Sequence, residues 1–344
     1  MYFEDSKQLN EHDDEVVNTV SNLSSASPSN NEIKITNQFD QLSDKFSHYL
    51  FGQTINNISH DELSQFVESE IVKLLDHPKA LVKSLPVLPL SLTTLIDELK
   101  NDDFNTELLI SIINKEPMVA AKVIELANSA KYNHHNREIT DLKSAFMTIG
   151  ANGLSEGIIV HYLKRMKPTA NVYFKHYGEK IWLHSLSTGN NCQSLLSISH
   201  SPTDKATAYL IGLILNLGAM VVFQLLIQAF SFVNPNCTPD SAAFKALLKK
   251  YAPRITYQIA KFWQLPEKVT HTLKLQLIIK DEVTLANITK KFPLAGYTFE
   301  ANAISQLHVL FQENKITEDE LKEISQTILY SSESKTLLAQ ILTQ

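Results

Sequence analysis

Apolar residues recur at helical spacing along most of the chain. The clearest case is the segment 142–149, in which Leu, Ala, Phe and Ile stand at positions i, i+3, i+4 and i+7, one face of an amphipathic helix. Thr140 is expected to cap this helix and Gly150 to end it. The same period predicts further helices over 63–74, 91–100, 108–113, 119–127, 181–196, 206–230, 242–251, 255–262, 269–279 and 321–329. No alternating strand of useful length interrupts these segments, so the chain is predicted to be all-α.

Helix starts and breaks are marked by local motifs. Ser59-His60-Asp61-Glu62 and Thr317-Glu318-Asp319-Glu320 both place a hydroxyl residue three positions before a glutamate. This is the capping box, in which two side chains satisfy backbone N–H groups at a helix start. The two prolines of Leu85-Pro86-Val87-Leu88-Pro89 predict an extended connection before the helix at 91–100.

The stretch 206–223 is the most apolar part of the chain. Its 18 residues reach the lower limit for a membrane-spanning helix. However, no Lys or Arg occurs between Lys205 and Lys245, so the stretch lacks the flanking charges that anchor and orient a span. We therefore expect a pair of buried core helices and no membrane partner.

Composition narrows the classes further. The 344 residues are 44% hydrophobic and 20% charged, as in a soluble globular protein, and only 9 are glycine, which disfavours glycine-lined phosphate loops. The net charge of −6 makes nucleic acid an unlikely partner. Cys192 and Cys237 are too few for a disulfide framework or zinc cage, and the acidic start Met1–Asp5 lacks the features of a signal peptide. A cytoplasmic location is expected.

Several short motifs could carry chemistry, but their contexts favour structural roles. Gly153-Leu154-Ser155-Glu156-Gly157 spells a hydrolase nucleophile elbow without the strand that this motif requires. The dipeptides His12-Asp13, His60-Asp61 and His134-His135 are predicted to lie in a tail, a helix cap and a loop. Three basic clusters, at 164–167, 249–254 and 290–291, are interpreted as solvated faces. A nucleic-acid or nucleotide sensor using Lys164–Lys167 stays open as a binding alternative.

Seven motifs in order carry a family resemblance. They are LPVLP at 85–89, INKEP at 113–117, VIELANSA at 123–130, AFMTIG at 145–150, WLHS at 182–185, GLILNLG at 212–218 and WQLP at 263–266. This set resembles the HD-related output domain (HDOD) family of bacterial signalling proteins, an all-helical relative of the HD metal-dependent phosphohydrolases. The resemblance implies an HD-like helical core with additional N- and C-terminal helices.

The departures from the HD pattern concern the metal ligands. The resemblance implies that His184 keeps the first ligand position, that Leu215-Asn216 replaces the His-Asp pair, and that Gln276 stands where a later histidine is expected. Leucine offers no lone pair and asparagine only a neutral carbonyl, so we expect no catalytic metal, no cofactor and no catalytic residue. His184 is interpreted as a core histidine that uses Asn216 as its acceptor.

The resemblance implies a non-catalytic, bacterial signal-transduction protein that acts through protein contacts or a small ligand bound in the remnant pocket. Trp182, Asn128 and Ser129 are named as possible ligand or partner contacts, although Trp182 also suits a core anchor. The alternative is an HD-type metal-dependent phosphohydrolase with a non-standard ligand set, drawn from His161, His176, His200 or His271.

The same reasoning divides the chain into four parts. Residues 1–37 are acidic and then rich in Ser and Asn, which predicts a polar tail or linker. Residues 38–80 are predicted to form an N-terminal helical extension, 81–285 the HDOD-like domain, and 286–344 a C-terminal helical extension.

Overall fold

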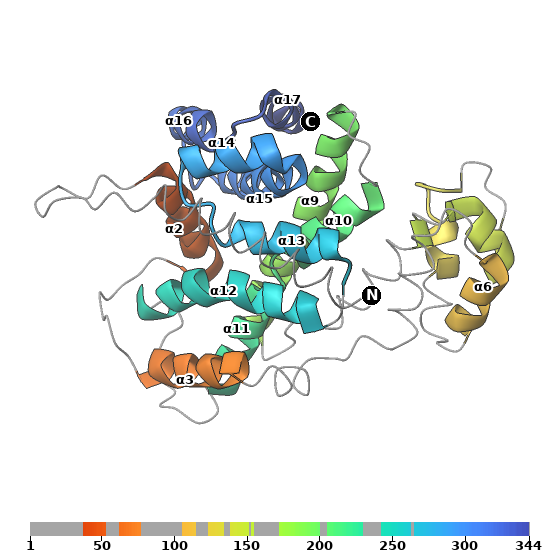
Figure 1. The fold of residues 1–344 in the computed structure, drawn as a ribbon, viewed down its shortest axis with the longest axis horizontal. Helices are drawn as coiled ribbons and strands as arrows, with labels where there is room; N and C mark the ends of the chain where they lie inside the picture. The colour runs from red at the N-terminus through yellow and green to blue at the C-terminus, as the bar shows by residue number, and fades with distance from the viewer. Residues whose placement is uncertain are drawn as a thin grey trace, which may run out of the picture.

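The computed structural model describes residues 37–52, 62–76, 105–114, 123–133, 138–150, 153–154, 172–199, 205–229, 242–262 and 265–343. Within these ranges every regular element is a helix and there is no strand, which confirms the all-α prediction. Figure 1 shows the arrangement. The helices are α2 Gln38–Phe51, α3 Glu62–Asp76, α6 Thr106–Asn114, α9 Val172–Ile198, α10 Lys205–Ile214, α11 Leu217–Ala229, α12 Ala242–Phe262, α13 Glu267–Gln276, α14 Glu282–Lys291, α15 Pro293–Gln312, α16 Glu318–Ile328 and α17 Ser332–Leu342.

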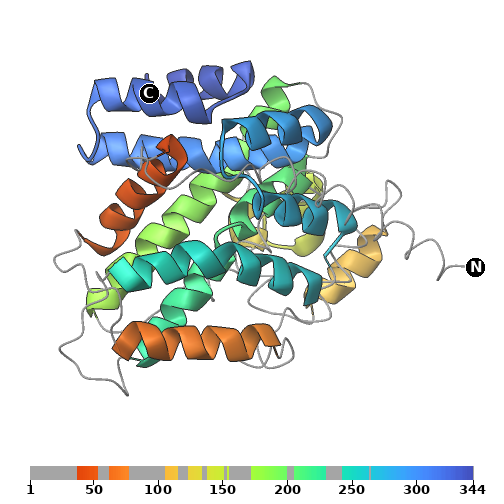
Figure 2. The ribbon, with the colours of Figure 1, turned by 60° about the vertical axis from the view of Figure 1, so that its left-hand side comes forward.

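Two long helices, α9 and α15, organise the main bundle. α15 packs against α9 and also contacts α2, α10, α13, α14, α16 and α17 (Figures 1 and 2). Its buried side chains lie on several faces, as expected of a helix surrounded by others. The N-terminal helices α2 and α3 contribute Leu42, Phe46, Leu63 and Val67 to this same hydrophobic core. The segments before and after the motif-bearing region are therefore integral to the core.

Glycines allow three helix pairs to approach closely. A Cβ atom placed on Gly212 of α10 would lie 2.7 Å from the carbonyl oxygen of Thr188 on α9. At Gly218 of α11 it would lie 1.8 Å from the carbonyl oxygen of Ala252 on α12, and at Gly296 of α15 it would lie 2.1 Å from Thr289 Oγ1. At these three positions no larger residue would fit without moving the neighbouring helix.

The apolar stretch forms the predicted pair of buried helices. Thr207–Ala229 is long and apolar enough for a membrane span, the single such case among the residues described, but 67% of its most apolar window is buried inside the protein. A turn at Leu215 and Asn216 separates α10 from α11. The bundle itself therefore supplies the apolar surroundings of these helices.

A second, smaller hydrophobic cluster lies apart from the bundle, on the right in Figure 1. It joins α6 to the helical residues 142–150 through side chains such as Leu109, Ile113 and Phe146. Gly150 has a φ of 65°, the left-handed conformation that ends helices, as predicted. The predicted cap at Thr140 was wrong: the Asp141 carboxylate accepts the backbone N–H of Ser144 at 2.8 Å instead.

The C-terminal helix starts follow side-chain capping. The capping box of Thr317 and Glu320 is present at α16 as predicted. A second capping box, formed by Asp281 and Thr284 at α14, was not predicted, because the third position of the helix holds threonine where the motif has glutamate or glutamine. Several predictions lie outside the described residues. They concern residues 1–36, Ser59–Asp61, Leu85–Pro89, the helix at 91–100, His134-His135, Ser155–Gly157, Lys164–Lys167 and Cys237.

Candidate functional site around His184

The positions that the family resemblance relates to the HD ligands lie on helices and a turn that pack against α15. His184 lies in the middle of α9, Leu215 and Asn216 form the turn between α10 and α11, and Gln276 is the last residue of α13. α15 contacts α9, α10 and α13, so it is the element against which all of these positions are placed. In this cluster, α9, α10 and α13 of the motif-bearing region pack against α15, which follows that region in the sequence.

His184 is enclosed by protein on all sides. Its side chain is buried, Nδ1 lies 2.8 Å from Ser305 Oγ on α15, and the Phe46 ring of α2 lies 4.5 Å from the imidazole between centroids. Burial lowers the pKa of His184 to about 4, against a smaller opposing effect of the nearby Asn302 side chain. The ring is therefore neutral at physiological pH. Its Nε2 atom is buried and has no hydrogen-bond partner among the described residues.

Asn302 of α15 connects Asn216 to α9. Asn216 Nδ2 donates to Asn302 Oδ1 at 3.1 Å, and Thr188 Oγ1 lies 3.4 Å from the same oxygen while donating to the His184 carbonyl at 2.9 Å. The sequence-based interpretation paired Asn216 with His184, but the structure gives His184 Ser305 as its partner. The reason is that α15 packs along α9 and presents its own polar residues to both side chains.

Leu215 takes part in this site through its backbone carbonyl, because its side chain has no atom that could bind a metal ion. Its half-buried side chain packs against the main hydrophobic core. Its carbonyl accepts the hydroxyl of Thr256 at 3.0 Å, and the same hydroxyl oxygen accepts the N–H of Gly218 at 2.9 Å. These bonds fix the turn between α10 and α11 against α12, which positions Asn216.

Gln276 is used in helix packing. Its Nε2 donates to the Ala295 carbonyl of α15 at 2.9 Å and to the Thr272 carbonyl of its own helix at 3.3 Å. The amide thereby supplies a partner to a backbone carbonyl near the start of α15. No hydrogen bond links it to His184 or Asn216 among the described residues.

The donor set does not fit a divalent cation of the HD type. Such an ion needs several imidazole or carboxylate ligands, whereas the cluster holds one imidazole, two asparagine amides and two hydroxyls. No group of three or more His, Cys, Asp or Glu side chains suited to a metal occurs in the described part of the chain. Of the alternative ligands, His271 packs edge-on against Phe292 at 5.0 Å. His161, His200 and the side chain of His176 lie outside what the structure describes.

The remaining predicted contact residues have structural roles where they are seen. Trp182 is buried in the main core. Asn128 donates to the Ile139 carbonyl at 2.6 Å and accepts the Ile139 N–H at 2.9 Å, which clamps the smaller cluster. Ser129 Oγ donates to the Leu126 carbonyl at 2.6 Å.

Four residues of the site were missed by sequence reasoning: Phe46, Thr188, Asn302 and Ser305. Phe46 lies in the N-terminal helix, far from any motif. Asn302 and Ser305 stand three positions apart inside a helix that is otherwise largely apolar. Such a spacing places two polar side chains on one helix face, and this signal could have indicated a buried polar contact.

Comparisons with known proteins agree on the domain and the fold. The HDOD domain profile matches residues 85–277, which is more than half of the chain. A crystal structure of a candidate phosphohydrolase from Shewanella amazonensis SB2B has a TM-score of 0.52 at 18% identity, covering 79% of this chain and 93% of that one. An HDOD domain protein of unknown function from Geobacter sulfurreducens has a TM-score of 0.52 at 16% identity, covering 80% and 95%. A candidate signal transduction protein from Marinobacter aquaeolei VT8 has a TM-score of 0.52 at 16% identity, covering 84% of this chain and 65% of that one. No curated protein matches the chain.

Proposed function

The chain belongs to the HDOD family, and from this premise we propose that it is a bacterial, cytoplasmic signal-transduction protein that binds partners without catalysing a reaction. Its output passes through contacts with a signalling protein or through a small ligand. The HD-related position has become a packing joint between α9, α15 and α2. One structure of the same fold supports a role of this kind, because it is named as a candidate signal transduction protein.

The observation that carries this proposal is the state of His184. Its Nδ1 is bound to Ser305, Phe46 covers the ring, and the neighbouring Asn216 is bound to Asn302. A water-activating metal would need several imidazole or carboxylate ligands, and among the described residues this cluster offers a single imidazole.

The test uses the full-length chain. We expect that purified protein, supplied with Mn²⁺, Mg²⁺ or Ni²⁺ and a panel of nucleotides and cyclic dinucleotides, shows no turnover above that of His184→Ala. Elemental analysis is expected to find no stoichiometric metal. Thermal melts of both proteins check that the variant is folded. Turnover that disappears in His184→Ala, or one bound ion per chain, would overturn the proposal.

One observation favours a second candidate, a metal-dependent phosphohydrolase with a non-standard ligand set. The buried Nε2 of His184 has no hydrogen-bond partner in the part of the chain that the structure describes, and a protein of the same fold is named as a candidate phosphohydrolase. A stoichiometric ion that is lost in His184→Ala or His271→Ala would support this candidate. Retention of the ion in both variants would count against these ligands.

A further inference from the structure

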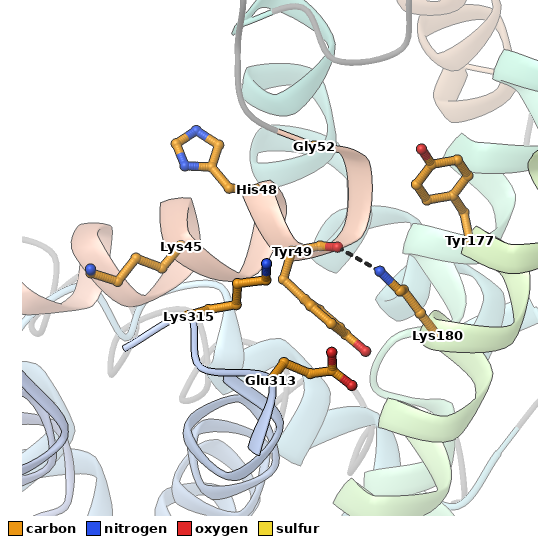
Figure 3. Close-up of a pocket in the computed structure, with 8 residues that line it drawn as sticks. All are labelled: Lys45, His48, Tyr49, Gly52, Tyr177, Lys180, Glu313 and Lys315. Carbon is orange, nitrogen blue, oxygen red and sulfur yellow. Dashed lines mark hydrogen bonds between the residues drawn. The ribbon is translucent and has the colours of Figure 1, made fainter. Parts of the chain in front are cut away.

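A cleft with a volume of about 550 Å³ lies between α2, α9 and the turn that joins α15 to α16. Figure 3 shows its lining, which includes none of His184, Leu215, Asn216 and Gln276. Its volume falls within the range of about 300–1,000 Å³ that is typical of small-molecule sites. The cleft is therefore separate from the cluster around His184.

Lysines dominate the charge of this cleft. Lys45, Lys180 and Lys315 line it, with Glu313 as the one carboxylate in the lining. Lys45 is paired with Glu320 at 2.8 Å, whereas no described residue forms an ion pair with Lys315. The positive charges also affect His48, which lines the cleft. Burial lowers the pKa of His48, and the charges of Lys245 and Lys45 lower it further, whereas Asp44 raises it.

Lys180 is the most constrained of these cations. Its Nζ donates to the Tyr49 carbonyl at 2.9 Å and lies 4.0 Å from the centre of the Tyr49 ring. Burial lowers the pKa of Lys180, and Lys315 lowers it while Glu313 raises it. An ammonium group has three N–H donors, so the single carbonyl leaves donors for an anion in the cleft. Figure 3 shows Lys180 and Lys315 on opposite sides of the Tyr49 side chain.

The turn that carries Glu313 and Lys315 has a defined backbone. Asn314 adopts a φ of 52°, in the left-handed region that asparagine tolerates. The N–H of Lys315 donates to the Leu310 carbonyl at 2.8 Å and that of Asn314 to Phe311 at 3.0 Å, the two bonds of a Schellman motif. The positions of Lys315 and Glu313 are thereby fixed by the end of α15 and not by a loose loop.

We propose that this cleft binds a small molecule that carries a phosphate group. Lys180 and Lys315 would hold the phosphate oxygens, since charge-assisted hydrogen bonds from ammonium groups to phosphate are strong and tolerant of angle. Glu313 would accept a hydroxyl or amino group elsewhere on the same molecule. The rings of Tyr49 and Tyr177 provide apolar wall on the α2 and α9 sides.

Occupation of the cleft would also secure α2. The same helix supplies Lys45 and Tyr49 to the cleft and places Phe46 on His184. A ligand that bridges α2, α9 and the α15–α16 turn stabilises the packed position of α2, because binding adds to the stability of the state that contains the site. The inference goes beyond the regulatory role proposed above and does not depend on whether the protein is an enzyme.

The test is calorimetric titration of the full-length chain with pyrophosphate and ribose 5-phosphate, with ribose and sulfate as control solutes at matched ionic strength. We expect both phosphate compounds to bind, and ribose and sulfate to bind at least tenfold more weakly. Lys180→Met and Lys315→Met are each expected to weaken binding at least tenfold. Lys290→Met, on the exposed last turn of α14, is expected to leave binding unchanged.

Clear results would overturn the proposal. These are no binding of either phosphate compound, equal binding of sulfate, or unchanged binding in Lys315→Met. Lys315 is an exposed turn residue, so its variant is expected to fold even if Lys180→Met does not. Thermal melts of all variants without ligand verify this point.

Discussion

The Nδ1 atom of His184 lies 2.8 Å from the Oγ atom of Ser305, a residue 121 positions later in the chain. The same hydroxyl lies 3.4 Å from the His184 carbonyl. One serine on α15 is therefore bound to both the side chain and the backbone of His184, the residue that the family resemblance relates to an HD metal ligand. This contact gives the imidazole a packing role, because it joins α9 to α15.

Ser305→Ala is expected to lower the free energy of unfolding by about 1–3 kcal/mol, because it leaves a buried imidazole nitrogen without a partner. Chemical denaturation of the full-length chain measures the change. Ser197→Ala is the matched control, since Ser197 is exposed on α9 and bonds only to the Gln193 carbonyl. Equal effects of the two substitutions would show that the contact with His184 contributes nothing.

Because of His184, the free energy of unfolding is expected to decrease as the pH falls. Burial holds the folded-state pKa at about 4, below the ordinary value of 6.5. Between these values the unfolded chain binds the proton and the folded chain does not, so stability present above pH 6.5 is lost as the pH falls toward 4. From pH 8 to pH 5, the wild type should lose about 2 kcal/mol more than His184→Gln. Parallel curves for the two proteins, measured by denaturant titration, would rule this out.

Much of the fold could be predicted from the sequence because it rests on local patterns. The period of apolar residues predicted α3, α6, α13 and α16 to within a few residues, and the hydroxyl-to-glutamate spacing predicted the cap of α16 at Thr317. The prediction of two helices at 242–251 and 255–262 was wrong, because α12 continues through Pro253. α2, α15 and α17 lie in segments that were predicted only as helical extensions. The buried pair α10 and α11 followed from the absence of flanking charge at 206–223. Where the pattern was ambiguous between adjacent polar residues, as at Thr140 and Asp141, the choice depended on backbone geometry that the sequence does not encode directly.

The site could be predicted only in part because its contacts are long-range. The motifs named His184 and Asn216, and the structure links each of them to a side chain of α15. Their actual partners, Ser305 and Asn302, lie on α15, beyond every motif and beyond the matched residues 85–277. Gln276 was placed at the remnant site by alignment, yet its amide bonds to the start of α15. Spacing along the chain carries no information about which helix covers a pocket.

Gly218→Ala is expected to cost about 3 kcal/mol or more, because its Cβ would lie 1.8 Å from the Ala252 carbonyl oxygen and α11 would have to separate from α12. Thermal and denaturant unfolding measure the loss. Gly189→Ala is the control: its Cβ would lie 3.1 Å or more from its neighbours, and the higher helix propensity of alanine, worth about 1 kcal/mol, offsets mild crowding. A variant Gly218→Ala as stable as Gly189→Ala would contradict the close approach of the two helices.

Glu300 gives a pH dependence of the opposite sign to His184. Its fully buried carboxylate accepts the N–H of Ser331 at 2.7 Å and the Ser331 hydroxyl at 2.8 Å, which holds the residue that caps α17. Burial raises the pKa of Glu300 despite these hydrogen bonds. The folded state therefore binds the proton more tightly than the unfolded state, and the contribution of this group to stability declines as the pH rises through the raised pKa.

Glu300→Gln removes that decline but loses one acceptor, so we expect the variant to be less stable by about 1–3 kcal/mol at pH 5 and closer to the wild type at pH 8. Denaturant unfolding at both values measures the two differences, and a gap that is constant or wider at pH 8 would show that Glu300 is charged in the folded state throughout this range.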